Sequence, residues 1–353
     1  MKKSVRKLGI LFIVAMMLIL TACGGNKDSA NKDDSSEKVD VVKIGAILPL
    51  TGSAASIGEM SKRAMELAVE EINENGGIES LGGAKLELVF GDSEGKPQVG
   101  VSETERLITK ENVAILTGAY QSGVTLPASE VAERYKKVWL ASVASEVSIT
   151  ERGFKYVFRS GDTTPIRVKA QVEFMKDLQE KSGVDLKTVA LVYENTAWGQ
   201  GTADSWKELL PEAGFEIVLD EAYDASSADL TPVVTKVKNA NPDVVLLCSY
   251  VSDATLLANG FWQHKVQPKA FIGTSGGYAD PEYIRNTGEA TLGYFDYALW
   301  EGDVNRPNSK ETNEKFYEKY GVYMNGAAVQ EYSGIYIIKD ALERAGSLDS
   351  EAL

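Results

Sequence analysis

Short apolar runs alternate with helical patterns along most of this chain, and this alternation constrains the fold more than any other feature. Each run is strand-length and rich in β-branched residues, and most of the stretches between runs carry apolar residues at helical spacing. The predicted strands of the first half are residues 41–48, 84–90, 113–116, 138–142 and 156–160. Strands that alternate with helices pair in parallel, with helices on both faces of the sheet.

Residues 161–165 (GDTTP) interrupt this pattern, which then begins again. Further strands are predicted at 188–193, 215–219, 244–249 and 270–272. Residues 293–300 are expected to form a strand that returns to the first lobe, before helices at 309–320 and 327–345. The expected fold is therefore α/β, with two Rossmann-like, doubly wound lobes joined by a hinge of several crossings. Lobe 1 comprises residues 41–162 and 291–353, and lobe 2 comprises residues 163–290. A cleft between two such lobes is a common small-molecule site.

The stretch GAYQSGVTLPAS (residues 118–129) follows the third predicted strand and opens a helix. A strand-to-helix turn exposes free backbone N–H groups and the positive end of a helix dipole at the carboxyl edge of the sheet. Ser122 adds a hydroxyl there, so this turn is a candidate anion site. The alternative is that Ser122 only caps its own helix, since serine is a favoured cap residue.

The first residues have the features of an export signal. A basic start and a short apolar run (residues 8–20) precede LTAC at residues 20–23, which resembles a bacterial lipobox. Residues 1–22 are thus interpreted as a lipoprotein signal peptide, with Cys23 as the lipidated residue. Residues 23–40 are mostly polar and are expected to form a disordered tether. The protein is expected at the outer face of the membrane or in the periplasm. Ordinary cleavage next to a chance cysteine is the alternative.

The composition argues against several classes of function. The formal charge of −14 disfavours nucleic acid, and one histidine with two cysteines provides no zinc cluster. His264 is the only histidine and is expected at the surface, so no catalytic triad or dyad is predicted. Cys248 falls in an apolar run and is expected to be a small buried hydrophobe. We therefore expect no catalysis, no metal and no cofactor.

Several motifs together resemble type I solute-binding proteins of ABC transporters, of the leucine/isoleucine/valine class. They are VKIGAILPLTG (42–52), ELAVEEINENGG (66–77), the stretch 118–129, TERGFKYVFR (150–159) and WGQG (198–201). The similarity extends from about residue 41 to residue 346. It implies a two-lobed protein that closes on a small ligand and delivers it to a membrane permease.

The resemblance also implies ligand contacts. Ser122 corresponds to the hydroxyl that binds the ligand carboxylate, and Val143 and Ser145 to contacts after the fourth strand. Tyr250 corresponds to a second-lobe tyrosine. The remaining pocket positions correspond to Ile57, Tyr120, Gln121, Trp198 and Ala328. For Trp198 and Tyr250, core packing is the alternative, because aromatic side chains dominate cores as well as binding sites.

The chain departs from the family at two places that matter for the ligand. A disulfide that the family often has near Glu94 and Gln121 is absent, because neither position is a cysteine. The family position that often carries an acid for the ligand's α-ammonium corresponds to Ser275. Either Glu331 or Asp253 supplies the acid instead, or the ligand has no ammonium. We expect a ligand other than a plain branched-chain amino acid: either a larger or more polar amino acid, or a non-amino carboxylate such as an aromatic or keto acid.

The sequence thus predicts a monomeric, lipid-anchored solute-binding protein that serves an ABC import permease. The ligand is expected to be a small carboxylate or an amino-acid-like molecule, and the membrane is contacted only through Cys23. A ligand-sensing module for a membrane receptor is the main alternative, because the same fold can present a ligand to a receptor. An enzyme is the third possibility.

Overall fold

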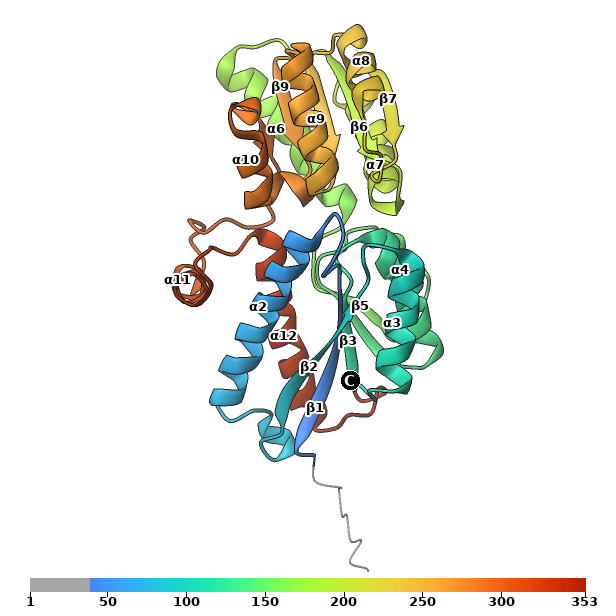
Figure 1. Ribbon diagram of the computed structural model, residues 1–353, viewed down its shortest axis with the longest axis vertical. Helices are drawn as coiled ribbons and strands as arrows, with labels where there is room; N and C mark the ends of the chain where they lie inside the picture. The colour runs from blue at the N-terminus through green and yellow to red at the C-terminus, as the bar shows by residue number, and fades with distance from the viewer. Residues whose placement is uncertain (1–38) are drawn as a thin grey trace, which may run out of the picture. The chain divides into compact units, whose positions relative to one another are not determined.

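The structure, a computed structural model, describes residues Val39–Leu353 (Figure 1). The signal segment, Cys23 and nearly all of the tether lie outside the described residues. The described chain forms two five-stranded sheets, and every strand pair within them is parallel. We call each sheet, together with the helices that pack on it, a lobe. The predicted fold class, two parallel α/β lobes, is confirmed.

The first sheet has the strand order β2-β1-β3-β4-β5. Strands β1 and β2 pair from Val41 opposite Lys85 to Leu48 opposite Asp92. The strands of this sheet are β1 (Val41–Leu48), β2 (Lys85–Asp92), β3 (Ile115–Gly118), β4 (Val138–Ala141) and β5 (Val157–Arg159).

The second sheet has the order β10-β9-β8-β6-β7. Counted from β6, this is the same winding as the first sheet, because in both the second strand lies outside the first and the others follow on the opposite side. Its strands are β6 (Thr188–Glu194), β7 (Glu216–Tyr223), β8 (Val244–Cys248), β9 (Ala270–Gly273) and β10 (Phe295–Asp296).

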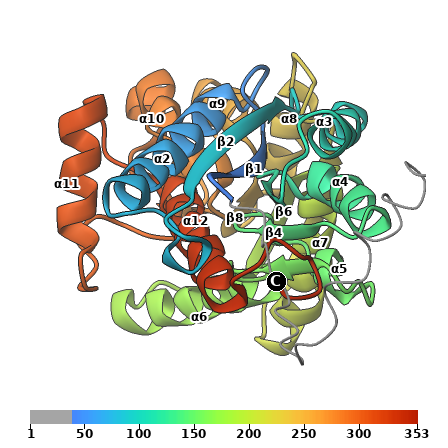
Figure 2. The same ribbon diagram turned by 90° about the horizontal axis from the view of Figure 1, so that it is seen from below.

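Helices cover both faces of each sheet. In the first lobe α2 packs along α12 and α3 along α4, as Figures 1 and 2 both show. The helices of the first half are α2 (Ala55–Glu74), α3 (Pro97–Thr109), α4 (Ser122–Arg134) and α5 (Ser148–Glu151). Those of the second lobe are α6 (Thr164–Ser182), α7 (Ala197–Glu212), α8 (Thr231–Ala240), α9 (Val251–His264) and α10 (Pro281–Thr287). Two more follow, α11 (Ser309–Tyr320) and α12 (Gly326–Ala345), and the short 3₁₀ segments are η1 (Glu79–Leu81), η2 (Gly276–Ala279) and η3 (Gly288–Thr291).

The strand β8 illustrates why the sequence builds this architecture. All five of its residues, VVLLC, are buried, as expected for a central strand covered by helices on both sides. Cys248 at its end is a free, buried thiol whose Sγ lies 3.6 Å from Oγ1 of Thr202, so the prediction of a small buried hydrophobe is confirmed.

The predicted strand at residues 293–300 is wrong in both length and partner. Only β10 is extended, and it pairs with β9 of the second sheet, with Phe295 opposite Ile272. The ring of Phe295 packs on Phe174 of α6 at 5.1 Å, which fixes this edge to the second lobe. The chain therefore returns to the first lobe only after Asp296, and the exact limits of the lobes given above remain a prediction.

The helix predicted from Thr202 begins earlier, at Ala197. The Glu194 carboxylate accepts hydrogen bonds from the backbone N–H groups of Thr196 and Gly199, at 2.7 Å each. These bonds satisfy donors at the start of α7, so the expected loop is shorter and Trp198 lies in the first helical turn. Among the described residues, no helix combines the length and the apolar character needed to cross a membrane.

Candidate functional site

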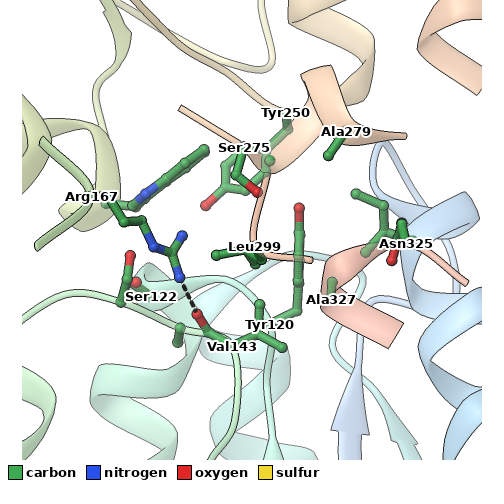
Figure 3. A pocket seen from close by; sticks show the side chains of 15 residues that line it. Tyr120, Ser122, Val143, Arg167, Tyr250, Ser275, Ala279, Leu299, Asn325 and Ala327 are labelled. Carbon is green, nitrogen blue, oxygen red and sulfur yellow. Dashed lines mark hydrogen bonds between the residues drawn. The ribbon is translucent and has the colours of Figure 1, made fainter. Parts of the chain in front are cut away.

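A pocket lies between the carboxyl edges of the two sheets (Figure 3). The space between its lining atoms, including its opening to solvent, is about 410 Å³. Both lobes contribute to it. Its lining residues are Ile57, Tyr120, Ser122, Val143, Ala144, Ser145, Arg167, Trp198, Tyr250, Ser275, Gly276, Ala279, Leu299, Asn325 and Ala327.

The strand order explains why the pocket forms here. In a doubly wound sheet the connections from two neighbouring strands leave on opposite faces, which opens a crevice at their carboxyl ends. In the first lobe these strands are β1 and β3, which are followed by Ile57 and Tyr120. In the second lobe they are β6 and β8, which are followed by Trp198 and Tyr250. The pocket is therefore where two such crevices meet.

Three aromatic rings from both lobes form one wall. The ring of Tyr250 lies 5.0 Å from that of Trp198 and 6.0 Å from that of Tyr120, both tilted. Such tilted pairs are favourable, and stiff rings contribute contact area at low entropic cost. All three rings belong to a buried hydrophobic cluster and also line the pocket, so core packing leaves them open to contact with a ligand.

Two donors on this wall have no protein partner. The hydroxyl of Tyr120 and the indole Nε1 of Trp198 are buried without a hydrogen bond. Burial raises the pKa of Tyr120, so its hydroxyl keeps its proton at neutral pH. Leaving buried donors unpaired costs about 1–3 kcal/mol each. A ligand with acceptor atoms at this wall would recover that energy.

Ser122 is not the cap of its helix. The residue before α4 is Gln121, and no side chain forms a cap hydrogen bond there. Instead, the Ser122 hydroxyl oxygen accepts a 3.2 Å bond from the backbone N–H of Glu146. The hydroxyl proton is thus free to donate towards the pocket that Ser122 lines.

Six helices begin at the pocket. The lining residues lie at or next to the first turn of α2, α4, α6, α7, α9 and α12. An uncapped helix start carries free N–H groups and about half a positive charge. Two of the six are partly capped, α7 by the Glu194 carboxylate and α12 by the Asn325 side chain. Although the whole chain has a formal charge of −14, the field of these helices at the pocket favours an anion.

Seven of the fifteen lining residues were not predicted from the sequence, and Arg167 is the charged one among them. It lies in the first turns of α6, after the chain crosses between the lobes, and is 3 % exposed. Its Nε and Nη2 donate to Oδ1 of Asp162 at 2.9 and 2.7 Å, and Nη2 also donates to the Val143 carbonyl at 3.2 Å. The only sequence signal was an arginine two residues after Pro165, which lies in the first turn of this helix.

The structure brings most of the predicted site residues together. Eight of them line the pocket: Ile57, Tyr120, Ser122, Val143, Ser145, Trp198, Tyr250 and Ser275. Ser145 shares a hydrogen bond with the Thr164 hydroxyl at 3.1 Å. Tyr120 and Ser275, from opposite lobes, both have positive φ angles, of 70° and 60°. Such conformations are costly for residues other than glycine and concentrate at ligand sites.

Three predicted residues do not line this pocket. The side-chain amide of Gln121 lies against Gly95, in the loop after β2. Ala328 packs against Phe316 and Met324 instead, because one helical step rotates it away from its neighbour Ala327, which lines the pocket.

Glu331, the third, lies on α12 one helical turn beyond Ala327 and is completely buried. Neither of its carboxylate oxygens has a hydrogen-bond partner of normal geometry, although the nearby Ser142 hydroxyl acts to lower its pKa. Burial dominates and raises its pKa to about 8. The other candidate acid, Asp253, also lies outside the lining and accepts a 2.6 Å bond from the Tyr223 hydroxyl.

Within residues 39–353 no group of three or more histidine, cysteine or acidic side chains is arranged to hold a metal ion. The lining offers hydroxyls, N–H groups, one guanidinium and aromatic rings. This arrangement can bind and orient a small molecule that has an acceptor-rich end and an apolar body.

Two facing parallel sheets with a pocket between their carboxyl edges define a two-lobed binding protein. Residues 41–353 match the family model described as periplasmic binding protein, and the chain belongs to this family. It is 33% identical over 322 residues to the Leu/Ile/Val-binding protein homolog 7 of Brucella abortus (strain 2308), covering 88% of this chain and 79% of that protein.

Solved structures show the same fold. The LivJ substrate-binding protein of a branched-chain amino acid transporter from Streptococcus pneumoniae, in complex with isoleucine, has a TM-score of 0.78 at 23% identity, with 88% of this chain and 86% of that chain covered. A solute-binding protein of an ABC transporter from Rhodopseudomonas palustris BisB5, in complex with 3,4-dihydroxybenzoic acid, has a TM-score of 0.76 at 23% identity, with 89% and 84% covered. The matching family model and the Brucella relative are both described as binding proteins, so the family is one of solute-binding proteins rather than of enzymes.

Proposed function

We propose that this protein captures a small carboxylate or amino-acid-like ligand between its lobes and delivers it to an ABC import permease. The observation that carries this proposal is the pocket itself, which is lined by buried hydrogen-bond donors and aromatic rings from both lobes. A ligand that contacts both lobes stabilises their closed arrangement, which is how binding would be reported to a permease.

The relatives support two classes of ligand. One similar protein was solved with isoleucine and another with a dihydroxybenzoic acid. Both ligands carry a carboxylate, the group that Ser122 and the helix starts are suited to bind.

Lipid anchoring through Cys23 is part of the proposal and rests on the sequence alone. In cells that process lipoproteins, Cys23→Ala should move the protein from the membrane fraction to the medium or the periplasm. A parent protein that is already soluble and carries no acyl mass on Cys23 would contradict anchoring, but would leave the binding function intact.

The binding function is tested by identifying what the protein carries. Purified protein is denatured, and the released small molecules are identified by mass spectrometry and then titrated back by calorimetry. We expect a near-stoichiometric organic acid or amino acid. The control is Ala327→Phe, which places a ring in the pocket and should abolish co-purification while circular dichroism stays unchanged. A parent protein that releases nothing, and that no small metabolite stabilises against heat, would contradict the proposal.

A further inference from the structure

We propose that Arg167 is the anion anchor of this pocket and that the ligand is a carboxylate without an α-ammonium group. This inference deepens the proposed function and rests on it. It infers the class of ligand from Arg167, a charged side chain that lines the pocket and uses only some of its hydrogen-bond donors within the protein.

The guanidinium of Arg167 is held in place on one side only. Its hydrogen bonds to Asp162 and to the Val143 carbonyl use Nε and Nη2. None of them uses Nη1, which retains two N–H groups. Figure 3 shows the guanidinium directed into the space between the lobes, with its bond to Val143 dashed. A buried arginine fixed in this way is a ready partner for a carboxylate, because little entropy is lost when the ligand binds.

The charge of Arg167 is balanced, but not from within the pocket. Asp162 does not line the pocket, and both of its carboxylate oxygens are engaged. Its Oδ1 accepts the two bonds from Arg167, and its Oδ2 accepts a 3.1 Å bond from the Tyr297 hydroxyl. The pair is therefore a structural element whose positive end alone faces the ligand.

The lining contains no carboxylate that could bind an ammonium. Three aspartates lie close in sequence to lining residues, but each already accepts hydrogen bonds within the protein. Asp253 accepts from the Tyr223 hydroxyl, and Asp296 accepts from the Ser275 N–H. Asp280 accepts from the Ser56 hydroxyl and the Glu282 N–H. Glu331 is buried outside the lining. Four of the helix starts at the pocket, those of α2, α4, α6 and α9, have no side-chain cap, so an ammonium would be desolvated next to like charge, which is costly.

The hydrogen-bond donors without a protein partner narrow the chemical class of the ligand further. The Tyr120 hydroxyl and the Trp198 indole N–H need acceptors, and both belong to the aromatic wall. A flat or branched acid with a second oxygen, as in a 2-oxo acid or a hydroxylated aromatic acid, supplies an acceptor there as well as a carboxylate for Arg167.

Matched ligand pairs test the class by calorimetric titration. The pairs are 4-methyl-2-oxopentanoate with leucine, and phenylpyruvate with phenylalanine; benzoate and 4-hydroxybenzoate complete the panel. We expect the acid without an ammonium to bind at least about 10-fold more tightly than its amino-acid partner. The reason is that leaving one buried charge unpaired costs more free energy than a 10-fold change in affinity represents. Tighter binding of either amino acid overturns the inference.

Variants test the residue. Arg167→Gln should weaken binding of the preferred acid by about 10- to 100-fold, the range for a hydrogen bond to a charged group. Lys176→Gln removes the same charge from an exposed position on α6 and should leave affinity unchanged. If Arg167→Gln does not fold, Arg167→Lys keeps the positive charge but lacks the paired N–H groups of the guanidinium, and it should still weaken binding. Unchanged affinity in whichever of the two folds overturns the inference.

Two further outcomes separate this inference from the proposed function. If amino acids bind and Glu331→Gln abolishes their binding, Glu331 is the ammonium partner and the inference is wrong, while solute binding stands. If no member of the panel binds but the purified protein releases a neutral or cationic compound, the inference is likewise overturned and the binding function is kept.

Discussion

The Ser56 hydroxyl donates a 2.9 Å hydrogen bond to Oδ2 of Asp280, joining residues 224 positions apart, one in each lobe. A second contact lies beside it, from the Ser252 hydroxyl to the Ser53 carbonyl at 3.2 Å. Asp280 also caps α10 by accepting from the N–H of Glu282. These bonds fasten the edge of the pocket and hold the lobes together.

Ser56→Ala should therefore weaken ligand binding by about 0.5–1.5 kcal/mol, the usual contribution of one hydrogen bond. The reason is linkage, since a bond made only when the lobes are together contributes to the affinity of a ligand that needs them together. Calorimetric titration measures it, with Ser102→Ala, an exposed serine within α3, as the control. Equal affinities for parent and Ser56→Ala would show that this contact does not contribute to closure.

Ser122→Ala should reduce affinity by about 1.5–3 kcal/mol, the range for a hydrogen bond to a charged group. Thermal stability should change little, because Ser122 does not cap α4 and its hydroxyl only accepts one 3.2 Å bond from the Glu146 N–H. Titration and a melting curve on the same sample measure both quantities. A variant that binds normally but melts several degrees lower would indicate a purely structural role.

A buried amide in the second lobe gives a stability prediction. Gln171 donates to the Gly273 carbonyl at 2.7 Å and to the Thr274 hydroxyl at 2.9 Å, and accepts from Trp206 Nε1 at 3.0 Å. Gln171→Met keeps the length of the side chain but leaves these buried groups unpaired. We expect a loss of about 2–4 kcal/mol in the free energy of unfolding, measured with urea.

The matched control is Gln179→Met on the same helix, where the side chain is only half-buried and no side-chain hydrogen bond is lost. This variant should stay within about 0.5 kcal/mol of the parent. Similar losses for the two variants would mean that methionine disturbs α6 generally, rather than breaking the network around Trp206.

Glu331 predicts a pH dependence of stability. Burial raises its pKa from 4.5 to about 8 in the folded protein, so between these values the folded state binds a proton that the unfolded chain releases. The stability that this proton binding contributes is fully present below about pH 4.5 and is lost as the pH rises through about 8.

Glu331→Gln should accordingly stabilise the protein relative to the parent at pH 8 by about 2–4 kcal/mol, since one pKa unit corresponds to about 1.4 kcal/mol. At pH 5 the two proteins should be closer in stability. Urea unfolding at both pH values measures the difference between the variants, which removes the contribution of other groups such as Asp253. A difference that does not depend on pH would show that Glu331 is ionised in the folded state.

The strand-helix alternation predicted both sheets because it is a local pattern that each segment carries by itself. Ser122 could be predicted from its turn after a central strand, where a parallel sheet collects its ligand contacts, whereas Tyr250 and Trp198 were predicted from the resemblance to the family. All three line the pocket. Arg167 and Asn325 could not be predicted, because they come from segments next to the lobe crossings, where only the tertiary arrangement brings them to the pocket. The strand predicted at 293–300 failed for a related reason, since an apolar run does not encode which sheet it will join.

A crystal structure of the protein with the ligand that it carries from the cell would show directly whether Arg167 binds a carboxylate. We predict density for a small acid between the lobes, with its carboxylate within hydrogen-bond distance of Nη1 of Arg167 and of the Ser122 hydroxyl. An apolar or aromatic body should lie against the rings of Tyr120, Trp198 and Tyr250. Density for the ligand outside this pocket, or an ammonium group facing Arg167, would contradict this prediction.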